Sequence, residues 1–485
     1  MLMSHNTKFS LFGNANIPLG RKKYQGIGFA VLVWFSFLTS SPGGLFAMQG
    51  KPFDSHRVNE FMQEFDDRTW KMRTEKRSRE LDKRIQKAKL SVADKVEVFR
   101  RLAPSRDPTG GSEELRMTRL LLSIAPTDLP RFKAALEYDG DYKDMVEYVF
   151  HDIDKTTYRD EIIKHFRQAS QQVGIKVLSD VDDTMYANLI EDRYPKKMLY
   201  PGVIEFYDAL KREPFEMNGI PLTTLSARPN PIAGTLEEGS LSNLVERSGG
   251  RLCPSALSGQ LVSAAIGTFQ TFIRAKLTPV VEKIQLPDGE EKEIGIVKFK
   301  NFANFSTVYP EYGYVFVGDS GQADALTAQL ILAEGLADGA SRVMTTFIHD
   351  LRQAENDGKA ASQAFKKLPP DLIVTKTSTS GRGVIVFRNY IEAAVIAHTH
   401  SSALGDLMTV EGLARITKAA LEEFVAQEAA FQNAGKADSR KKLRDQYRQD
   451  AEDALRILAV VTPKPGPLEN DVTAIRRILD EKFAN

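Results

Sequence analysis

Residues 175–184 read IKVLSDVDDT, an apolar run that ends abruptly in a serine and three aspartates. Three later runs have a similar form: LTTL at 222–225, YVFV at 314–317 and VMTTFI at 343–348, each with polar residues directly after it or within two positions. Helix-like stretches separate these runs. Short buried strands that alternate with helices are typical of an α/β domain built on a parallel sheet, which is the fold class we expect.

The residues that follow these runs carry the candidate chemistry, because ligands of parallel sheets bind at the carboxyl ends of the strands. Asp180 and Asp182 come after the first run and can reach one substrate if the backbone turns at once. One carboxylate can then act as a nucleophile and the other as a general acid and base, as phosphoryl transfer through a covalent intermediate requires. Taken alone, the same string is also typical of a surface turn or a capping cluster.

A second acidic motif, GDSGQAD at 318–324, also begins at the end of a run. Its Asp319 and Asp324 can complete a cage of carboxylates around a hard cation such as Mg²⁺, together with the aspartates at 180 and 182. The alternative is a strand-to-helix loop whose aspartates cap the following helix.

Two weaker signals add a hydroxyl and an amine. Ser226 follows the second run and can donate to a phosphoryl oxygen, although a serine before Arg-Pro is also an ordinary turn. Lys298 precedes the second acidic motif and can neutralise a phosphoryl group and its neighbouring carboxylates. Lys300 is the alternative, because two lysines two positions apart would share one side of a strand. An isolated Lys-x-Lys is also typical of an exposed surface.

The composition excludes several classes of protein and of metal site. The chain has 485 residues with 65 Lys and Arg against 64 Asp and Glu, a net charge of +1. It lacks the basic field with which proteins bind nucleic acid, so we expect no nucleic-acid partner. The single cysteine, Cys253, excludes an intramolecular disulfide and a zinc site with two thiolates, and the 7 histidines are scattered. Carboxylates must therefore hold any metal.

Residues 1–47 have the pattern of a secretory signal peptide, with basic residues at 21–23, an apolar run at 27–38 and then small residues. The apolar run is short for a membrane-spanning helix, which needs about 20 residues. We therefore expect export to the periplasm or the extracellular space. An uncleaved anchor and a cytosolic chain with a chance apolar start are the alternatives, because Leu45 is large for its position before a cleavage site after Ala47.

Three regions are expected behind this segment: a helical N-terminal region at 48–170, the α/β domain at 171–352, and a mainly helical C-terminal region at 353–485. The C-terminal region begins with a predicted pair of strands at 372–375 and 384–388. We assign no chemistry to either flank, and the default expectation is that both pack on the α/β domain.

Together, the motifs are similar in order to those of the haloacid dehalogenase superfamily: Asp-x-Asp-x-Thr after one strand, serine after the next, a lysine, and Gly-Asp-x-x-x-x-Asp after a later strand. Four stretches further resemble the catalytic domain of phosphatidate phosphatases of the actin-patch-protein type: LSDVDDT at 178–184, YPGV at 200–203, LSARP at 225–229 and GDSGQAD at 318–324. The resemblance covers roughly residues 171–352, with 400 as its furthest reach. It implies a Rossmann-like sheet of the haloacid dehalogenase type.

The resemblance implies a role for each catalytic residue. Asp180 attacks phosphorus and becomes an aspartyl-phosphate. Asp182 protonates the leaving alkoxide and then deprotonates the hydrolytic water, and its presence favours phosphate esters over dehalogenation. Ser226 holds a phosphoryl oxygen. Lys298 fits the spacing of the family's lysine better than Lys300 does.

The resemblance also implies Mg²⁺. Asp319 would bind the ion together with the Asp180 carboxylate and the Asp182 backbone carbonyl, and Asp324 would bind it or orient its ligands. The two residues after Asp182 would shape the loop without reacting. The physical reason for the ion is that a phosphate monoester and several aspartates repel one another, so a cation and a lysine must cancel their charge.

The implied activity is Mg²⁺-dependent hydrolysis of a phosphate monoester, with phosphatidate, cleaved to diacylglycerol and phosphate, as the expected substrate. A peripheral membrane contact fits that substrate. Residues 184–222 leave little room for a large cap domain, and residues 227–297 are long enough for a modest lid. A lightly capped site also suits a soluble phosphate or a phosphoprotein. A non-catalytic binding module is the alternative from another class. The sequence leaves the oligomeric state open.

Overall fold

The structure is a computed structural model of the chain. It divides into two compact units, Met1–Gly44 and Leu45–Asn485, and all residues described here belong to the second. The predicted signal peptide therefore lies outside the described part. The structure describes residues 53–66, 74–103, 111–137, 145–169, 172–188, 190–191, 193–210, 219–225, 241–257, 290–321, 323–337, 342–351, 373–374, 383–400, 406–428, 430, 437–461, 466 and 468–484.

The described residues form a seven-stranded sheet in which every pair of neighbouring strands is parallel. This confirms the expected fold class, α/β with a parallel sheet. The four apolar runs of the sequence are β1, β2, β4 and β5. In spatial order the strands are β3 (Leu252–Leu257), β2 (Ile220–Leu225), β1 (Gly174–Ser179), β4 (Tyr312–Asp319), β5 (Val343–His349), β7 (Val384–Phe387) and β6 (Ile373–Val374).

Strand β3 lies within residues 227–297, the segment that is long enough for a modest lid. It pairs with β2 along its whole length and forms one edge of the sheet, so this part of the segment belongs to the core. Pro254 obscured the strand in the sequence, because proline lacks an amide donor and is confined in sheets to edge strands, strand starts and bulges. Residues 226–240 and 258–289 lie outside the described part of the chain.

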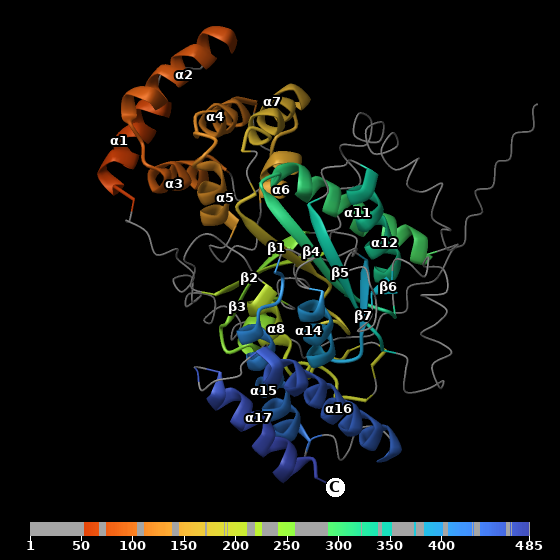
Figure 1. Cartoon of the computed structure of the whole chain (residues 1–485). Coiled ribbons are helices and arrows are strands. Elements are labelled where there is room, and N and C mark those ends of the chain that lie inside the picture. Colours follow the sequence, from red (N-terminus) through yellow and green to blue (C-terminus); the bar gives the residue numbers. More distant parts are fainter. Residues whose placement is uncertain are drawn as a thin grey trace, which may run out of the picture. The chain divides into compact units, whose positions relative to one another are not determined.

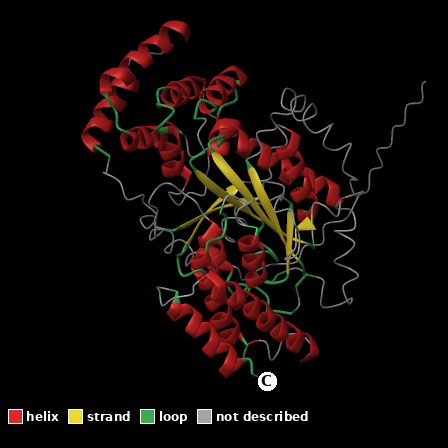
Figure 2. Cartoon of the chain, in the orientation of Figure 1, coloured by secondary structure: helices red, strands yellow, loops and turns green. Residues whose placement is uncertain are grey.

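Helices cover both faces of the sheet (Figure 1, Figure 2). Successive strand residues point to opposite faces, so Leu178 belongs to one apolar core and Val177 to the other. The first core includes residues of α11 and α12, and the second includes residues of α8, α14 and α15. These helices are α8 (Val203–Leu210), α11 (Glu290–Val308), α12 (Asp324–Ala337), α14 (Tyr390–Thr399) and α15 (Val410–Gln427).

The N-terminal helices pack on the first face and are joined to it by two buried ion pairs. Lys133 Nζ donates to Glu311 Oε1 at 2.9 Å, and Lys176 Nζ of β1 donates to Glu137 Oε2 at 2.5 Å. None of the four residues is more than 2% exposed. We call them the balanced cluster, because two positive charges meet two negative ones. The N-terminal elements are α1 (Ser55–Asp66), α2 (Thr74–Ala88), α3 (Val92–Leu102), α4 (Gly111–Leu122), α5 (Leu129–Glu137), α6 (Met145–Glu147), the π-helix η1 (Tyr148–Asp152) and α7 (Thr156–Phe166).

The C-terminal region contributes to the sheet as well as to its covering helices. The predicted strand pair corresponds to β6 and β7, which lie side by side in parallel, and β7 also pairs with β5. The sheet therefore continues past residue 352, where the sequence placed the end of the α/β domain. The last helices are α16 (Ala437–Val461) and α17 (Glu469–Lys482). No helix within the described ranges combines the length and apolarity needed to cross a membrane.

Candidate functional site

Three carboxylates meet at the carboxyl ends of β1 and β4. Asp180 directly follows β1, and Asp319 is the last residue of the adjacent strand β4. Asp324 is the first residue of α12, and its Oδ2 accepts a hydrogen bond from the Asp319 amide at 3.3 Å, so it lies against the strand end. One oxygen from each carboxylate lies within 4.8 Å of those of the other two. We call these three residues the acidic cluster.

Lys298 supplies a cation to the acidic cluster. Its Nζ donates to Asp180 Oδ1 at 2.8 Å and to Asp324 Oδ1 at 2.5 Å, and the residue is only 3% exposed. Lys298 and Lys300 lie on helix α11, so the expectation that they share one side of a strand is wrong. Positions two residues apart in a helix are separated by about 200° around its axis. Lys300 therefore lies on another face of α11 than Lys298, and it is partly exposed.

The acidic cluster has more negative charge than its lysine can balance. Three carboxylates and one ammonium leave an excess of two negative charges when all are ionised. Within the described part of the chain, Asp180 Oδ2 and Asp319 Oδ2 are buried without a hydrogen-bond partner. Buried acceptors without a donor are costly, and a hard divalent cation prefers such carboxylate oxygens. The cluster can therefore hold a metal ion.

The pKa values of the cluster reflect the same imbalance. Burial raises the pKa of Asp180 to about 7; the Lys298 ammonium opposes this rise, and the Asp324 charge adds to it. Burial and the charges of Asp324 and Asp180 raise the pKa of Asp319 well above its usual range. Burial lowers the pKa of Lys298, but Asp180 and Asp324 outweigh burial and the net pKa is raised. Lys298 therefore stays charged, and its one positive charge does not balance the negative charge of the three carboxylates.

Asp182 lies two residues after Asp180, but its carboxylate is not part of the acidic cluster. Its Oδ1 accepts hydrogen bonds from Asn188 Nδ2 at 2.8 Å and Lys197 Nζ at 3.4 Å. The Lys197 ammonium also lies 4.5 Å from the centre of the Tyr186 ring. The side chain is 8% exposed, and its charge adds to the rise in the pKa of Asp180, so the Asp182 carboxylate lies near the acidic cluster.

Ser226 lies outside the described residues. The strand before it, β2, ends at Leu225 and is the direct neighbour of β1, with Thr224 opposite Ser179. The expected position of Ser226 one residue past this strand end stays a prediction.

Asp183 organises the loop that follows β1. Its carboxylate accepts backbone hydrogen bonds from Asn188 at 2.7 Å, Ile190 at 2.8 Å and Glu191 at 3.4 Å. Its backbone has φ +57°, in the left-handed region that Asp tolerates better than most residues. Asp183 therefore fixes the backbone amides of Asn188, Ile190 and Glu191 relative to the end of β1.

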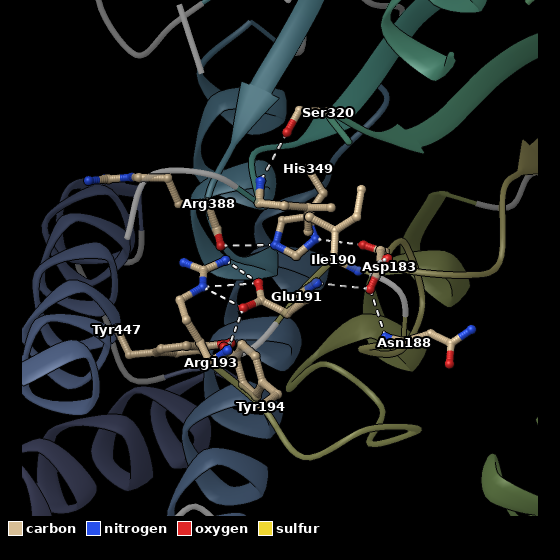
Figure 3. A network of polar contacts seen from close by, with 11 residues as sticks. Asp183, Asn188, Ile190, Glu191, Arg193, Tyr194, Ser320, His349, Arg388 and Tyr447 are labelled. Atoms are coloured by element: carbon tan, nitrogen blue, oxygen red, sulfur yellow. Dashed lines mark hydrogen bonds and ion pairs between the residues drawn. The ribbon is translucent and has the colours of Figure 1, made fainter. Parts of the chain in front are cut away.

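His349 is the last residue of β5, and the sequence indicated its place at a strand end but no role for it. Its Nδ1 lies 3.2 Å from the backbone oxygen of Asp183, and its Nε2 lies 3.1 Å from that of Arg388. Figure 3 shows the ring between these two backbone oxygens. Burial, together with the Arg193 charge, lowers the pKa of His349 to about 4, so the ring is neutral near pH 7. Its position at the end of the fourth apolar run was the available signal.

Comparisons with known proteins give the chain no family. No protein-family model, no curated protein and no solved structure matches it. The resemblance to the haloacid dehalogenase superfamily therefore stays an expectation.

Proposed function

We propose that this protein is a Mg²⁺-dependent phosphatase of the haloacid dehalogenase type, which hydrolyses a phosphate monoester through an aspartyl-phosphate. The observation that carries the proposal is the acidic cluster with its lysine, in which two carboxylate oxygens are buried without a donor. Such a site attracts a divalent cation and, with it, a dianionic phosphoryl group. A cluster that served only stability would balance its charges internally.

The residues divide the reaction between them. A carboxylate oxygen of Asp180 attacks phosphorus and forms an O–P bond, while the bond from phosphorus to the ester oxygen breaks. Protonated Asp182 gives its proton to the leaving alkoxide. In the second step Asp182 takes a proton from water, the water oxygen attacks phosphorus, and phosphate leaves as the Asp180 carboxylate is restored.

The positive charges make this attack feasible. Lys298 holds Asp180 in place and offsets the repulsion between carboxylates and phosphate. Asp180 and Asp319 would hold Mg²⁺ through their unpartnered oxygens, and the bound ion supplies further charge neutralisation and orientation of the phosphoryl group. Asp324 anchors the other side of Lys298 and thereby fixes the lysine between the two motifs.

The substrate we propose is phosphatidate, and the motif wording at 178–184 and 318–324 supports it. Export of the protein and a peripheral membrane contact belong to the same proposal. A soluble phosphate or a phosphoprotein is the second candidate, because the same acidic cluster serves any phosphate monoester. A binding module without catalysis is the third.

The test is phosphate release from phosphatidate vesicles and from p-nitrophenyl phosphate, each with Mg²⁺ and with EDTA. Wild type is compared with Asp180→Asn and Lys298→Met, and Lys300→Met serves as the matched control on the same helix. We expect Mg²⁺-dependent release from phosphatidate that disappears in the first two variants and persists in the third. Release from the small ester alone would refute the lipid substrate, and no release from either would refute the phosphatase.

A further inference from the structure

The loop that carries Asp182 is anchored by a residue far away in the chain. The phenol of Tyr390, at the start of α14, donates a hydrogen bond to the backbone oxygen of Thr184 at 2.6 Å. Tyr390 is fully buried, and 206 positions separate the two residues. A backbone oxygen two residues past the proposed acid is thus fixed by the C-terminal region.

Tyr390 is part of a buried group of hydroxyls. Tyr207 of α8 is hydrogen-bonded to Tyr390, and its OH also lies 2.5 Å from Ser179 Oγ. Ser179 is the last residue of β1, and its Oγ donates to the backbone oxygen of Asp180. Tyr207 is 1% exposed and Ser179 is fully buried. Three elements, β1, α8 and α14, therefore meet beside the backbone of residues 180–184.

The opposite end of the same loop is fixed by the sheet. The amide of Asp180 donates to the backbone oxygen of Val317 at 2.9 Å, which continues the β1–β4 pairing to the proposed nucleophile. Asp182 lies between this anchor and the Thr184 anchor. The rate of a reaction between oriented groups depends strongly on their positions, since a displacement of about 1 Å can lower the rate by about 100-fold. The second anchor thus bears directly on where Asp182 lies relative to Asp180.

We propose that Tyr390 and Tyr207 are positioning residues: their hydroxyls hold the loop 180–184 so that Asp182 stands at the distance from Asp180 that catalysis needs. This rests on the proposed function, because the loop is catalytic only if the phosphatase assignment is correct. The C-terminal region then contributes to the active site by holding the loop 180–184 in position. This role does not require any of its residues to touch the substrate.

The test compares two tyrosine variants that lose the same chemical group. Tyr390→Phe removes the donor to Thr184, while Tyr314→Phe removes a buried phenol that donates to the backbone oxygen of Tyr309 in the first core. We expect Tyr390→Phe to lower kcat by about 10- to 100-fold with KM changed less than about threefold, as losses of supporting hydrogen bonds do. Tyr314→Phe should keep its kcat.

A second readout does not depend on catalysis. Amide hydrogen exchange of residues 181–186 should be faster in Tyr390→Phe than in wild type, and unchanged in Tyr314→Phe. If wild type hydrolyses no phosphate ester, the proposed function fails, while this exchange experiment still decides whether Tyr390 holds the loop. Equal exchange in both variants, or equal kcat values, would overturn the inference.

Tyr207→Phe and the double variant with Tyr390→Phe complete the design. Because the two hydroxyls act on one loop, their effects on kcat should be smaller together than the product of the single effects. Fully independent effects would contradict a shared role. Tyr207→Phe also tests the proposal by itself if Tyr390→Phe does not fold.

Discussion

Buried charged groups cluster at both ends of strand β1. The two clusters differ in how far their charges are compensated within the chain. In the balanced cluster, near its start, Lys133 and Lys176 pair with Glu311 and Glu137. Both lysines also lie over aromatic rings, and Lys133 Nζ is 4.1 Å from the centre of Phe166. At the other end, three aspartates share the single ammonium of Lys298.

The difference separates a structural cluster from a functional one. Buried ion pairs barely offset the cost of desolvation, so a cluster that serves the fold must be complete within the chain. The acidic cluster is incomplete in this sense, because two of its oxygens have no described donor. No group in the described part of the chain completes it, and unbalanced buried charge of this kind is typical of a binding site.

The largest expected effect comes from removing the nucleophile. Asp180→Asn should lower phosphatase activity by more than about 10⁴-fold, because an amide cannot form the aspartyl-phosphate. The same change should not lower the melting temperature in EDTA, since it removes a repelled charge. Phosphate release and thermal unfolding measure both. A melting temperature several degrees below wild type would contradict the division between the two clusters.

Neutralising one carboxylate should have opposite effects on stability at the two ends. Glu311→Gln leaves Lys133 buried without its counter-charge, which should cost about 3–5 kcal/mol of unfolding free energy. Asp319→Asn relieves repulsion and should stabilise the metal-free protein, because burial and its neighbours raise the pKa of Asp319. Denaturant unfolding in EDTA compares the two.

A double variant is the control for the balanced cluster. Lys133→Met combined with Glu311→Gln removes both charges of one pair and should recover part of the stability that Glu311→Gln loses. A similar loss in the single and double variants would show that packing, and not charge, dominates this cluster.

Mg²⁺ should stabilise the protein through the acidic cluster alone. At a concentration 100 times its Kd, the ion should add about 2.7 kcal/mol to the unfolding free energy. Glu311→Gln should respond like wild type, and Asp319→Asn should not respond. A thermal shift series in MgCl₂ measures this, and an unchanged response in Asp319→Asn would place the ion elsewhere.

The smallest effect concerns His349, a neutral group beside the acidic cluster. Its pKa in the folded protein is about 4, below the ordinary histidine pKa of about 6.5, so the unfolded chain takes up protons first as the pH falls. Stability from this group is present above pH 6.5 and is lost toward pH 4, by about 1 kcal/mol between pH 7 and 5.5.

The aspartate at 180 acts in the opposite direction. Its folded pKa of about 7 lies above 3.8, so in metal-free protein its contribution to stability rises as the pH falls. The His349 effect is therefore measured as the difference between wild type and His349→Asn, in which the aspartate contributes equally. If the two proteins lose the same stability between pH 7 and 5.5, the histidine is not buried in its neutral form.

The sequence predicted the acidic cluster, at the carboxyl end of β1, better than the balanced cluster near the start of this strand. Asp180, Asp319 and Asp324 follow apolar runs, and the rule that strand ends meet at one edge was enough to bring them together. Lys176, Glu137 and their partners carry no such signal, because isolated charges in helical or apolar stretches are usually solvated. Their pairing depends on how the N-terminal helices pack, which local patterns do not encode.

Two elements show where local patterns misled. The alternation Lys-Phe-Lys at 298–300 is typical of a strand, but Phe299, Phe302 and Phe305 recur every three residues on one face of α11 and belong to the first core. A window of three residues was too short to show this helical spacing. Tyr390 could not be found from the sequence at all, because a tyrosine that donates across 206 positions leaves no spacing to recognise.

The contact between Tyr390 and Thr184 also bears on chains that end early. Asp180, Asp182, Lys298 and Asp319 are all synthesised before α14, as are strands β1 to β7. A chain interrupted before residue 390 would therefore contain every charged group of the proposed reaction and still lack the phenol that seats the loop. If the proposed function and the role of Tyr390 are correct, such a fragment should be less active than the full chain, and the activity of the α/β domain would depend on completion of the C-terminal region.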